Sequence, residues 1–436
     1  GISIQKIPRI SQINKKLMEI GWGAVCVRGF IPPQVFMEFQ SLSILPIAAD
    51  MRSLKNLSYT PAPDIFHEAA GHAPIISDPN YSKYLKYYGN LAKNAIMTQE
   101  DVELYKCIRD LSDFKAKEKI SKEKLKSLER NLSRAIKNLN QNSEIVKLGR
   151  MNWWTVEYGL IGTIKTPKIY GAGLLSSVAE GYNALTENVK KIPIDLNVIK
   201  FDYDITNQQP QLFVTKNFDS LINILKVFET TLASKKGGLY ALKSSQESKM
   251  VNTIKFDSGI QIAGILNKIK YNTDSEPIYL KFKGPIQLGK NNKEINNHGP
   301  SKYKDGFFVP IGDYKINITH STIQNKLKLI EIIYVTGITI TAELLNKSKK
   351  IISSDILFLK NCNIIYKDKK LFYFNGGFTL VLCSKVDYAK RGPIDYDKFQ
   401  SYWMDSLKYE RIKNKYKTKK KNNKLKPYYN KIRLMR

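Results

Sequence analysis

Cysteine is scarce in this chain, and its arrangement excludes two classes of site. The four cysteines, Cys26, Cys107, Cys362 and Cys383, are scattered and form no CxxC pair. Neither a disulfide framework nor a thiolate zinc site is therefore indicated, and we expect a reducing, cytoplasmic location. Long apolar runs are lacking as well, so the sequence predicts no membrane partner.

Acidic residues are few relative to basic ones. Lys and Arg number 70 against 39 Asp and Glu, which gives a net charge of +31. Such a balance is typical of nucleic-acid-binding proteins, and that function stays open as one alternative. However, Lys, Asn and Ile are abundant along the whole chain, including segments typical of buried or loop sequence. We interpret the charge as a compositional bias rather than as one binding face.

The first half of the chain has globular character, interrupted by a charged segment over about 99–147 that lacks both Pro and Gly. Within it, apolar residues recur at helical spacing, first from Leu104 to Phe114 and then from Leu125 to Leu139. Ser121 is placed to cap the second run. We predict a helical hairpin inserted into a domain spanning 1–234, with no part in the chemistry.

The second half is predicted to be a β-rich domain over 239–400, followed by a basic tail over 401–436. Lys235–Gly238 separates the halves as a linker, and alternating apolar and polar residues then predict strands. The segment Phe256–Ile262, with Gly259, is echoed by Tyr334–Ile340, with Gly337, which suggests two related, barrel-like units. We expect this domain to contact a partner or a second copy and to add no catalytic group.

Histidine is as rare as cysteine, with four in all, and two of the histidines are close together. His67 and His72 are five residues apart, whereas a zinc hydrolase motif places its histidines four apart on one helix face. Five residues of α-helix turn through about 500°, which leaves the two rings about 140° apart. Convergence therefore needs the helix to end or widen between them, and we expect Gly71 to end it.

Glu157 supplies a candidate third ligand. It is a carboxylate in the apolar and aromatic run Trp153–Gly159, where an unpaired buried charge would be costly. Two histidines and one carboxylate form the facial triad of non-haem Fe(II) oxygenases, and metal ligation would compensate the charge. A zinc hydrolase with Glu68 as general base is the alternative, which the five-residue step disfavours.

Three segments resemble the pterin-dependent aromatic amino acid hydroxylases, and the long bacterial, phenylalanine 4-hydroxylase-like members most. They are YTPAPDIFHEAAGHAPIISDPNY at 59–81, WWTVEYGL at 153–160 and KIYGAGLLSS at 168–177. The resemblance runs from about residue 20 to about residue 234, with the charged insertion excluded. It implies a mainly helical, basket-like catalytic domain that binds Fe(II) and uses O2 and tetrahydropterin as co-substrates.

The resemblance also implies roles for individual residues. His67, His72 and Glu157 match the iron ligands. The residues that match substrate-binding positions are Arg52, for the substrate carboxylate, Thr60 and Ser176, for its backbone, and Pro63 and Trp153, for its ring. The residues that match the pterin site are Phe36, which would stack on the pterin, and Glu68, a carboxylate beside it.

This chain departs from the family pattern at several positions. Asn152 stands where many animal members have Tyr, and Leu45-Pro46 stands where they have Phe-His. The usual C-terminal tetramerisation helix is not recognisable, so the oligomeric state stays open. Tryptophan hydroxylases usually have a smaller aromatic residue at the position of Trp153, so the resemblance favours phenylalanine, then tyrosine, as substrate.

Overall fold

The computed structural model describes residues 9–27, 31, 33–52, 63–115, 121–204, 207–320, 328–345 and 355–399. It divides into two compact units: unit 1 is Gly1–Thr231 with Tyr409–Arg436, and unit 2 is Leu232–Lys408. Among the described residues, no helix combines the length and the apolar character that crossing a membrane requires. The basic tail predicted over 401–436 lies outside the described residues.

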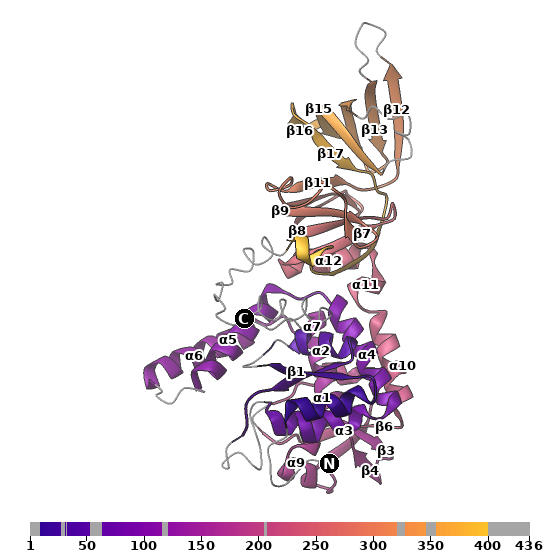
Figure 1. Ribbon diagram of the computed structural model, residues 1–436. Helices are drawn as coiled ribbons and strands as arrows, with labels where there is room; N and C mark the ends of the chain where they lie inside the picture. Colours follow the sequence, from indigo (N-terminus) through magenta and orange to yellow (C-terminus); the bar gives the residue numbers. More distant parts are fainter. Residues whose placement is uncertain are drawn as a thin grey trace. The chain divides into compact units, whose positions relative to one another are not determined.

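Unit 1 combines helices with two small sheets (Figure 1), so it is less purely helical than the sequence predicts. Its α-helices are α1 (Ile10–Met18), α2 (Pro33–Ser41), α3 (Ala73–Ile76), α4 (Pro79–Asn94), α5 (Gln99–Lys115), α6 (Lys122–Asn138), α7 (Glu144–Asn152), α8 (Ala172–Leu175), α9 (Val178–Asn183) and α10 (Phe218–Glu229). Two segments are π-helical, η2 (His67–His72) and η3 (Trp153–Glu157), and η4 (Leu196–Lys200) is a 3-10 helix.

The sheets of unit 1 join segments that are distant in sequence. Strands β1 (Gly23–Val27) and β2 (Ile44–Ala48) pair in parallel. The second sheet has the order β4-β3-β6-β5 and consists of β3 (Leu160–Gly162), β4 (Pro167–Ile169), β5 (Lys190–Pro193) and β6 (Gln211–Thr215). Because β3 begins three residues after η3 ends, this sheet fixes the C-terminal side of the π-helical segment that carries Glu157.

Helix α4 also packs against η3, the π-helical segment that carries Glu157. It starts with Pro79 after the cap residue Asp78, whose carboxylate accepts the backbone N–H groups of Asn80 and Tyr81. Its buried tyrosines reach toward η3 and α7: the Tyr84 hydroxyl lies 2.7 Å from Thr155 Oγ1, and the Tyr88 hydroxyl donates to Leu148 O at 2.6 Å. Helix α4 therefore packs against the segments that lead to Glu157.

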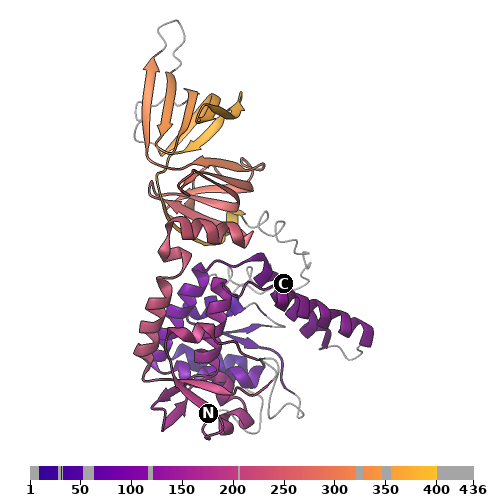
Figure 2. The ribbon, with the colours of Figure 1, turned by 180° about the vertical axis from the view of Figure 1, so that it is seen from behind.

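Helices α5 and α6 occupy the charged segment that interrupts the domain. They lie side by side and reach away from the rest of unit 1 in both views (Figures 1 and 2). Ser121 caps α6 by accepting the backbone N–H of Lys124 at 3.4 Å. Polar bonds hold the base of the hairpin to the body of the unit: Ser143 Oγ donates to Asp101 at 3.0 Å, and Ile96 N donates to Glu144 at 2.7 Å.

Unit 2 begins with two helices and continues as strands. The helices are α11 (Ala233–Lys236) and α12 (Gly238–Ser248), so the prediction of a linker at Lys235–Gly238 is wrong. Gly237 between them has a φ of +62°, and a Cβ there would lie 2.2 Å from Asp387 O, which only glycine avoids. Gly237 packs against the strand Val386–Arg391, so this segment is an ordered part of unit 2 rather than an extended linker.

The strands of unit 2 form two six-stranded antiparallel sheets in which five strands, β7–β11 and β13–β17, pair in the same order, whereas the sixth strand comes later in the chain in the first sheet and earlier in the second. The first sheet has the order β10-β9-β8-β7-β18 with β11 paired to β9, and the second has the order β12-β13-β14-β15-β16 with β17 paired to β15. The strands of the first sheet are β7 (Val251–Phe256), β8 (Ile260–Tyr271), β9 (Pro277–Lys290), β10 (Lys293–Glu294), β11 (Phe307–Pro310) and β18 (Val386–Arg391). Those of the second are β12 (Tyr314–His320), β13 (Lys328–Tyr334), β14 (Ile338–Leu344), β15 (Ile356–Tyr366), β16 (Lys369–Phe374) and β17 (Phe378–Val381).

The turns of the two sheets match as well. Gly259, with φ +82°, and Gly337, with φ +94°, close corresponding hairpins and donate back to Phe256 O at 2.8 Å and Tyr334 O at 2.9 Å. Among the described strands neither sheet closes on itself, which differs from the barrel-like units expected from sequence. The matching strand order supports the duplication that the sequence echo suggested.

Candidate metal centre

The two histidines converge because the helix between them widens. Residues His67–His72 are π-helical, and the N–H of Ala73 donates to Glu68 O, five residues back. Since π-helical bonding links residues five apart, His67 and His72 come onto one face. The expectation that Gly71 ends the helix is wrong, because helical structure continues through α3. Gly71 is instead required by close packing: a Cβ there would lie 2.5 Å from Ala172 O.

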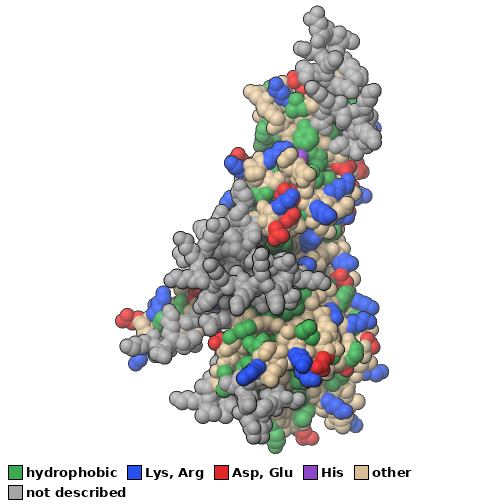
Figure 3. All heavy atoms as spheres, viewed as in Figure 1, with side chains coloured by type: hydrophobic (Ala, Val, Ile, Leu, Met, Phe, Trp, Pro, Cys, Tyr) green, Lys and Arg blue, Asp and Glu red, His purple; other side chains and the backbone are tan. Residues whose placement is uncertain are grey.

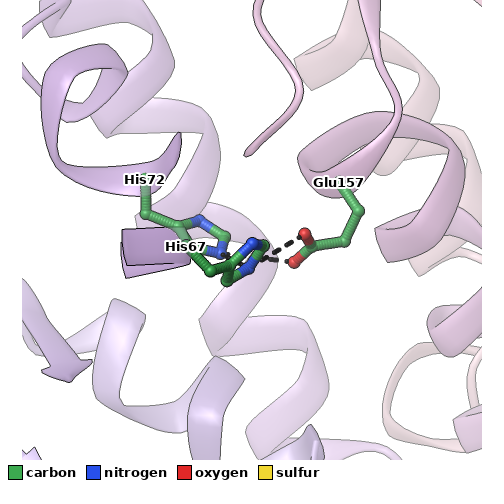
Figure 4. Close-up of side chains that lie close together, drawn as sticks. All are labelled: His67, His72 and Glu157. Carbon is green, nitrogen blue, oxygen red and sulfur yellow. Dashed lines mark hydrogen bonds and ion pairs between the residues drawn. The ribbon is translucent and has the colours of Figure 1, made fainter. Parts of the chain in front are cut away.

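Glu157 comes to the same point from a second π-helical segment. Tyr158 N donates to Trp153 O, again five residues back, at 2.8 Å. The carboxylate of Glu157 lies 3.3 Å from His67 Nε2 and 3.4 Å from His72 Nε2, and the two Nε2 atoms are 3.0 Å apart (Figure 4). In the described part of the chain these three residues are the group suited to hold a metal ion.

The spacing of these donor atoms fits a single metal ion. Donors that share one octahedral face, with metal–ligand bonds of about 2.1 Å, lie on the order of 3 Å apart. The three side chains are largely enclosed, with 11%, 1% and 15% of His67, His72 and Glu157 exposed. Two neutral imidazoles and one carboxylate carry a net charge of −1, so a bound divalent cation would leave the site with a net positive charge. Three protein ligands also leave coordination positions of the metal open for further ligands.

The electrostatics of the three residues are strongly coupled. Burial alone lowers the pKa of His67, but the Glu157 carboxylate, helped by Glu68 and Asp64, outweighs it and raises the pKa to about 9. Burial raises the pKa of Glu157, whereas the imidazoles of His72 and His67 hold it well below its usual value. The imidazolium of His67 and the carboxylate of Glu157 therefore stabilise each other. A bound cation would displace the imidazolium proton and bind the ionised carboxylate directly.

Outer interactions orient the first histidine. Ser176 Oγ donates to Ala172 O at 2.8 Å and lies 2.9 Å from His67 Nδ1, so it accepts the Nδ1–H and leaves Nε2 for a metal. Ser176 therefore contacts a metal ligand, in addition to any contact with substrate. For His72, the Nδ1 atom has no hydrogen-bond partner within the described ranges.

Arg52 and Asp64 form a buried ion pair next to the histidine segment. Arg52 Nε and Nη2 donate to the Asp64 carboxylate at 2.9 and 2.8 Å, and Nη1 donates to Ser176 O at 2.8 Å. Asp64 also accepts the backbone N–H of His67 at 2.9 Å, as a cap would. Burial raises the pKa of Asp64, but these bonds from Arg52 and His67 hold it below its usual value.

The remaining predicted residues are placed as follows. Phe36 lies over His72, with ring centroids 5.4 Å apart. Glu68 is buried beside the same histidine, its Oε2 4.0 Å from His72 Nε2 and without a hydrogen-bond partner among the described residues. Burial raises the pKa of Glu68, although His72 and His67 oppose the shift. Pro63 is exposed, and Thr60 lies outside the described residues.

Trp153, predicted as a wall of the substrate pocket, is part of an aromatic stack. Tyr158 and Tyr203 both stack on it, at centroid distances of 4.6 and 4.4 Å. Sequence reasoning missed both tyrosines, as well as Asp64. The position of Asp64, three residues before His67, was a capping signal, whereas no spacing indicated the contact with Tyr203.

A family model matches more than half of the chain. The model for biopterin-dependent aromatic amino acid hydroxylases matches residues 1–105 and 132–276. This chain belongs to that family. The match omits residues 106–131, inside the α5–α6 hairpin, and extends to residue 276, beyond the end near residue 234 inferred from sequence.

Individual relatives agree with the family match. The phenylalanine-4-hydroxylase of Pseudomonas aeruginosa is 28% identical over 226 residues, 51% of this chain and 69% of that protein. For the Chromobacterium violaceum enzyme the identity is 28% over 225 residues, 51% of this chain and 61% of that protein. A structure of the latter, with iron(III) and 7,8-dihydrobiopterin, is 26% identical, covers 52% of this chain and 69% of that chain, and has a TM-score of 0.39.

Proposed function

We propose that this protein hydroxylates the ring of an aromatic L-amino acid, converting phenylalanine to tyrosine with Fe(II), O2 and tetrahydropterin. The observation that carries the proposal is the convergence of His67, His72 and Glu157 from two π-helical segments, both inside the family match. When bound, iron with the pterin would supply the activation of O2, one oxygen atom of which enters the ring. The chain's own residues hold the reactants and exclude water.

The metal would be held by His67 Nε2, His72 Nε2 and the carboxylate of Glu157. The hydrogen bond from His67 Nδ1 to Ser176 keeps the imidazole in the required tautomer. The zinc hydrolase alternative gains no support, because the two histidines are five residues apart on a π-helical turn, whereas its motif places them four apart on an α-helix.

The substrate carboxylate would bind Arg52. A guanidinium has five N–H donors, and three are used on Asp64 and Ser176 O. One donor remains on each terminal nitrogen, which suffices for a two-point contact with a carboxylate. The ion pair with Asp64 fixes the plane of the guanidinium before substrate arrives. Thr60 and Ser176 are proposed to contact the amino acid backbone, and Pro63 and Trp153 its ring.

The pterin would stack on Phe36 and approach Glu68. The ring of Phe36 next to His72 supports a co-substrate site adjoining the metal. Burial raises the pKa of Glu68 and so favours its protonated carboxyl group, which can both donate and accept a hydrogen bond. A buried polar group lacking a partner is costly, and a polar ring edge would satisfy it.

For unit 2 we propose an accessory role. Its buried His298 bonds to the Tyr303 hydroxyl at 2.6 Å, and no metal-binding group of three lies among its described residues. Contact with a second copy of the chain is the role proposed for its sheets. Nucleic-acid binding is not favoured, because Lys and Arg side chains are interspersed with Asp and Glu on the face shown in Figure 3. A cytoplasmic location stays a prediction.

The test is amino-acid-dependent oxidation of tetrahydropterin by the full chain with Fe(II) in air. Phenylalanine should drive pterin oxidation with matching formation of tyrosine, and tyrosine and tryptophan should do so less well. Omitting Fe(II) or pretreating with a chelator should abolish turnover. Pterin oxidation that does not respond to any aromatic amino acid would contradict the proposal.

A further inference from the structure

The residue that follows the carboxylate ligand is held on three sides. The ring of Tyr158 stacks on Trp153 at 4.6 Å with an interplanar angle of 25°. Its edge packs against Gly173, where a Cβ would lie 3.0 Å from Tyr158 Cε2. Its hydroxyl donates to Glu180 Oε2 at 2.8 Å. Packing and the buried hydrogen bond to Glu180 therefore help to fix the position of Tyr158.

Glu180 connects this ring to a different part of unit 1. It lies on α9, is 3% exposed, and accepts the backbone N–H of Gln209 as well as the Tyr158 hydroxyl. Burial raises the pKa of Glu180, and the two hydrogen bonds oppose that shift. The side chain of Gln209 in turn donates to Asp204 O at 2.7 Å. The carboxylate thus links α9, the segment before β6 and the end of η3.

The same segment holds η3 from its other side. Tyr203, next to Asp204 in sequence, stacks on Trp153 at 4.4 Å and 11°. Trp154 Nε1 donates to Phe201 O at 2.9 Å, and Arg150 Nε donates to Asp202 at 2.9 Å. The contacts form a closed circuit. It runs from Trp153 on η3 to Tyr203, along the chain to Asp204, and from there through Gln209 and Glu180 back to Tyr158.

These contacts hold η3, which is a π-helical turn. π-Helical turns are rare and need support from their surroundings, and Glu157 is the last residue of this one. The Glu157 carboxylate must remain within reach of both histidines, so rotation of the turn would separate the ligands. We propose that Glu180 is a positioning residue that, through Tyr158, holds η3 so that Glu157 points at the metal and Trp153 stays in place.

This inference rests on the proposed function only in taking the three ligands to bind a metal. Residues that orient metal ligands without touching the metal typically contribute about 10- to 100-fold to metal affinity. Loss of the Glu180 carboxylate should therefore weaken metal binding by about this factor, although Glu180 is not itself a ligand.

The test uses the full metal-free chain titrated with Co(II), with near-ultraviolet circular dichroism recorded before the metal is added. Glu180→Ala should lower the Co(II) affinity about 10- to 100-fold and change the aromatic signal of the Tyr158–Trp153 stack. Tyr158→Phe should have the same direction of effect. Glu180→Gln keeps an oxygen that accepts the Tyr158 hydroxyl, so it should retain most of the affinity and of the signal.

Tyr87→Phe is the matched control. Tyr87 donates to Glu229 at 2.5 Å, so unit 1 contains a second tyrosine–glutamate bond on other elements, α4 and α10. Tyr87→Phe should leave Co(II) affinity unchanged. A loss equal to that of Glu180→Ala would show a general effect of destabilisation and overturn the inference.

Two further outcomes separate the inference from the proposed function. Wild-type protein that binds Co(II), together with Glu180→Ala and Glu180→Gln proteins that bind it equally well and show an unchanged aromatic signal, would overturn the positioning role alone. Wild-type protein that binds neither Co(II) nor Fe(II) would contradict the proposed function and the inference together.

Discussion

The two units bury polar side chains of different kinds. Unit 1 buries many ionisable side chains: Asp64, His67, Glu68 and His72 lie at or next to the metal centre, and Glu38, Asp101, Glu144, Arg150 and Glu180 are also buried. In unit 2 the buried polar side chains are mainly amides and hydroxyls within the sheets, among them Asn252, Thr253, Gln261 and Gln287. Buried charge is costly unless a partner or ligand compensates it. We therefore expect the chemistry of the molecule at the cluster of Asp64, His67, Glu68 and His72 in unit 1.

The largest expected effect comes from removing a ligand in unit 1. Glu157→Ala should lose nearly all bound iron and all turnover, because two imidazoles alone hold Fe(II) poorly. Iron is measured by elemental analysis after gel filtration, and folding by circular dichroism. His298→Gln is the control from unit 2 and should keep full iron. A Glu157→Ala protein with normal iron and turnover would mean that the ligand assignment is wrong.

Arg52→Lys should produce the next largest effect. A lysine cannot make the planar two-point contact, and loss of a charge-assisted bond worth about 1.5–3 kcal/mol should raise the KM for the amino acid about 10- to 100-fold. The thermal midpoint should also fall, because the side chains of Arg52 and Asp64 are each only 4% exposed and their bonds would be lost. Arg109→Lys on α5 should change neither quantity. An unchanged KM for Arg52→Lys would exclude Arg52 as the carboxylate contact.

Removal of unit 2 should affect catalysis less. A chain ending at Thr231 lacks unit 2 and also Tyr409–Arg436, and it keeps all proposed iron, substrate and pterin residues. We expect it to bind iron and to hydroxylate with a similar kcat, with any change seen in oligomeric state by light scattering. The family match continues to residue 276, so loss of pterin-dependent turnover with normal iron would show that α12, β7 and β8 complete the active site.

Shortening the α5–α6 hairpin should have the smallest effect. Replacing residues 106–131, which the family match omits, with a short Gly/Ser loop preserves the bonds at Asp101 and Glu144. Iron content and kcat should remain near wild type. Replacing 101–146 instead removes those bonds and should lower the thermal midpoint. If the shorter excision abolishes activity in folded protein, the hairpin takes part in catalysis.

The sequence alone predicted the helices and strands whose apolar residues recur with a regular period. The strands β7, β8 and β9 follow the alternating segments from which they were predicted, because a sheet imposes a two-residue period. The segment of α5 and α6 was predicted from the helical period in the same way. The matching Gly259 and Gly337 were visible because their positive φ angles demand glycine or a similar residue.

Sequence reasoning failed where geometry depends on distant contacts. It required the helix between His67 and His72 to end or widen, but chose an end at Gly71, whereas the helix widens. A π-helical turn has no sequence period of its own and is maintained by packing, here against Ala172. Likewise, the bond from Tyr158 to Glu180 joins residues 22 positions apart, and no local pattern indicates it.

The most direct measurement is a crystal structure of the full chain soaked with Fe(II) under anaerobic conditions, with anomalous diffraction recorded at the iron edge. The account predicts a single strong anomalous peak between His67 Nε2, His72 Nε2 and the Glu157 carboxylate, about 2.0–2.2 Å from each. No peak at that point, or a comparable peak at His298 in unit 2, would contradict it.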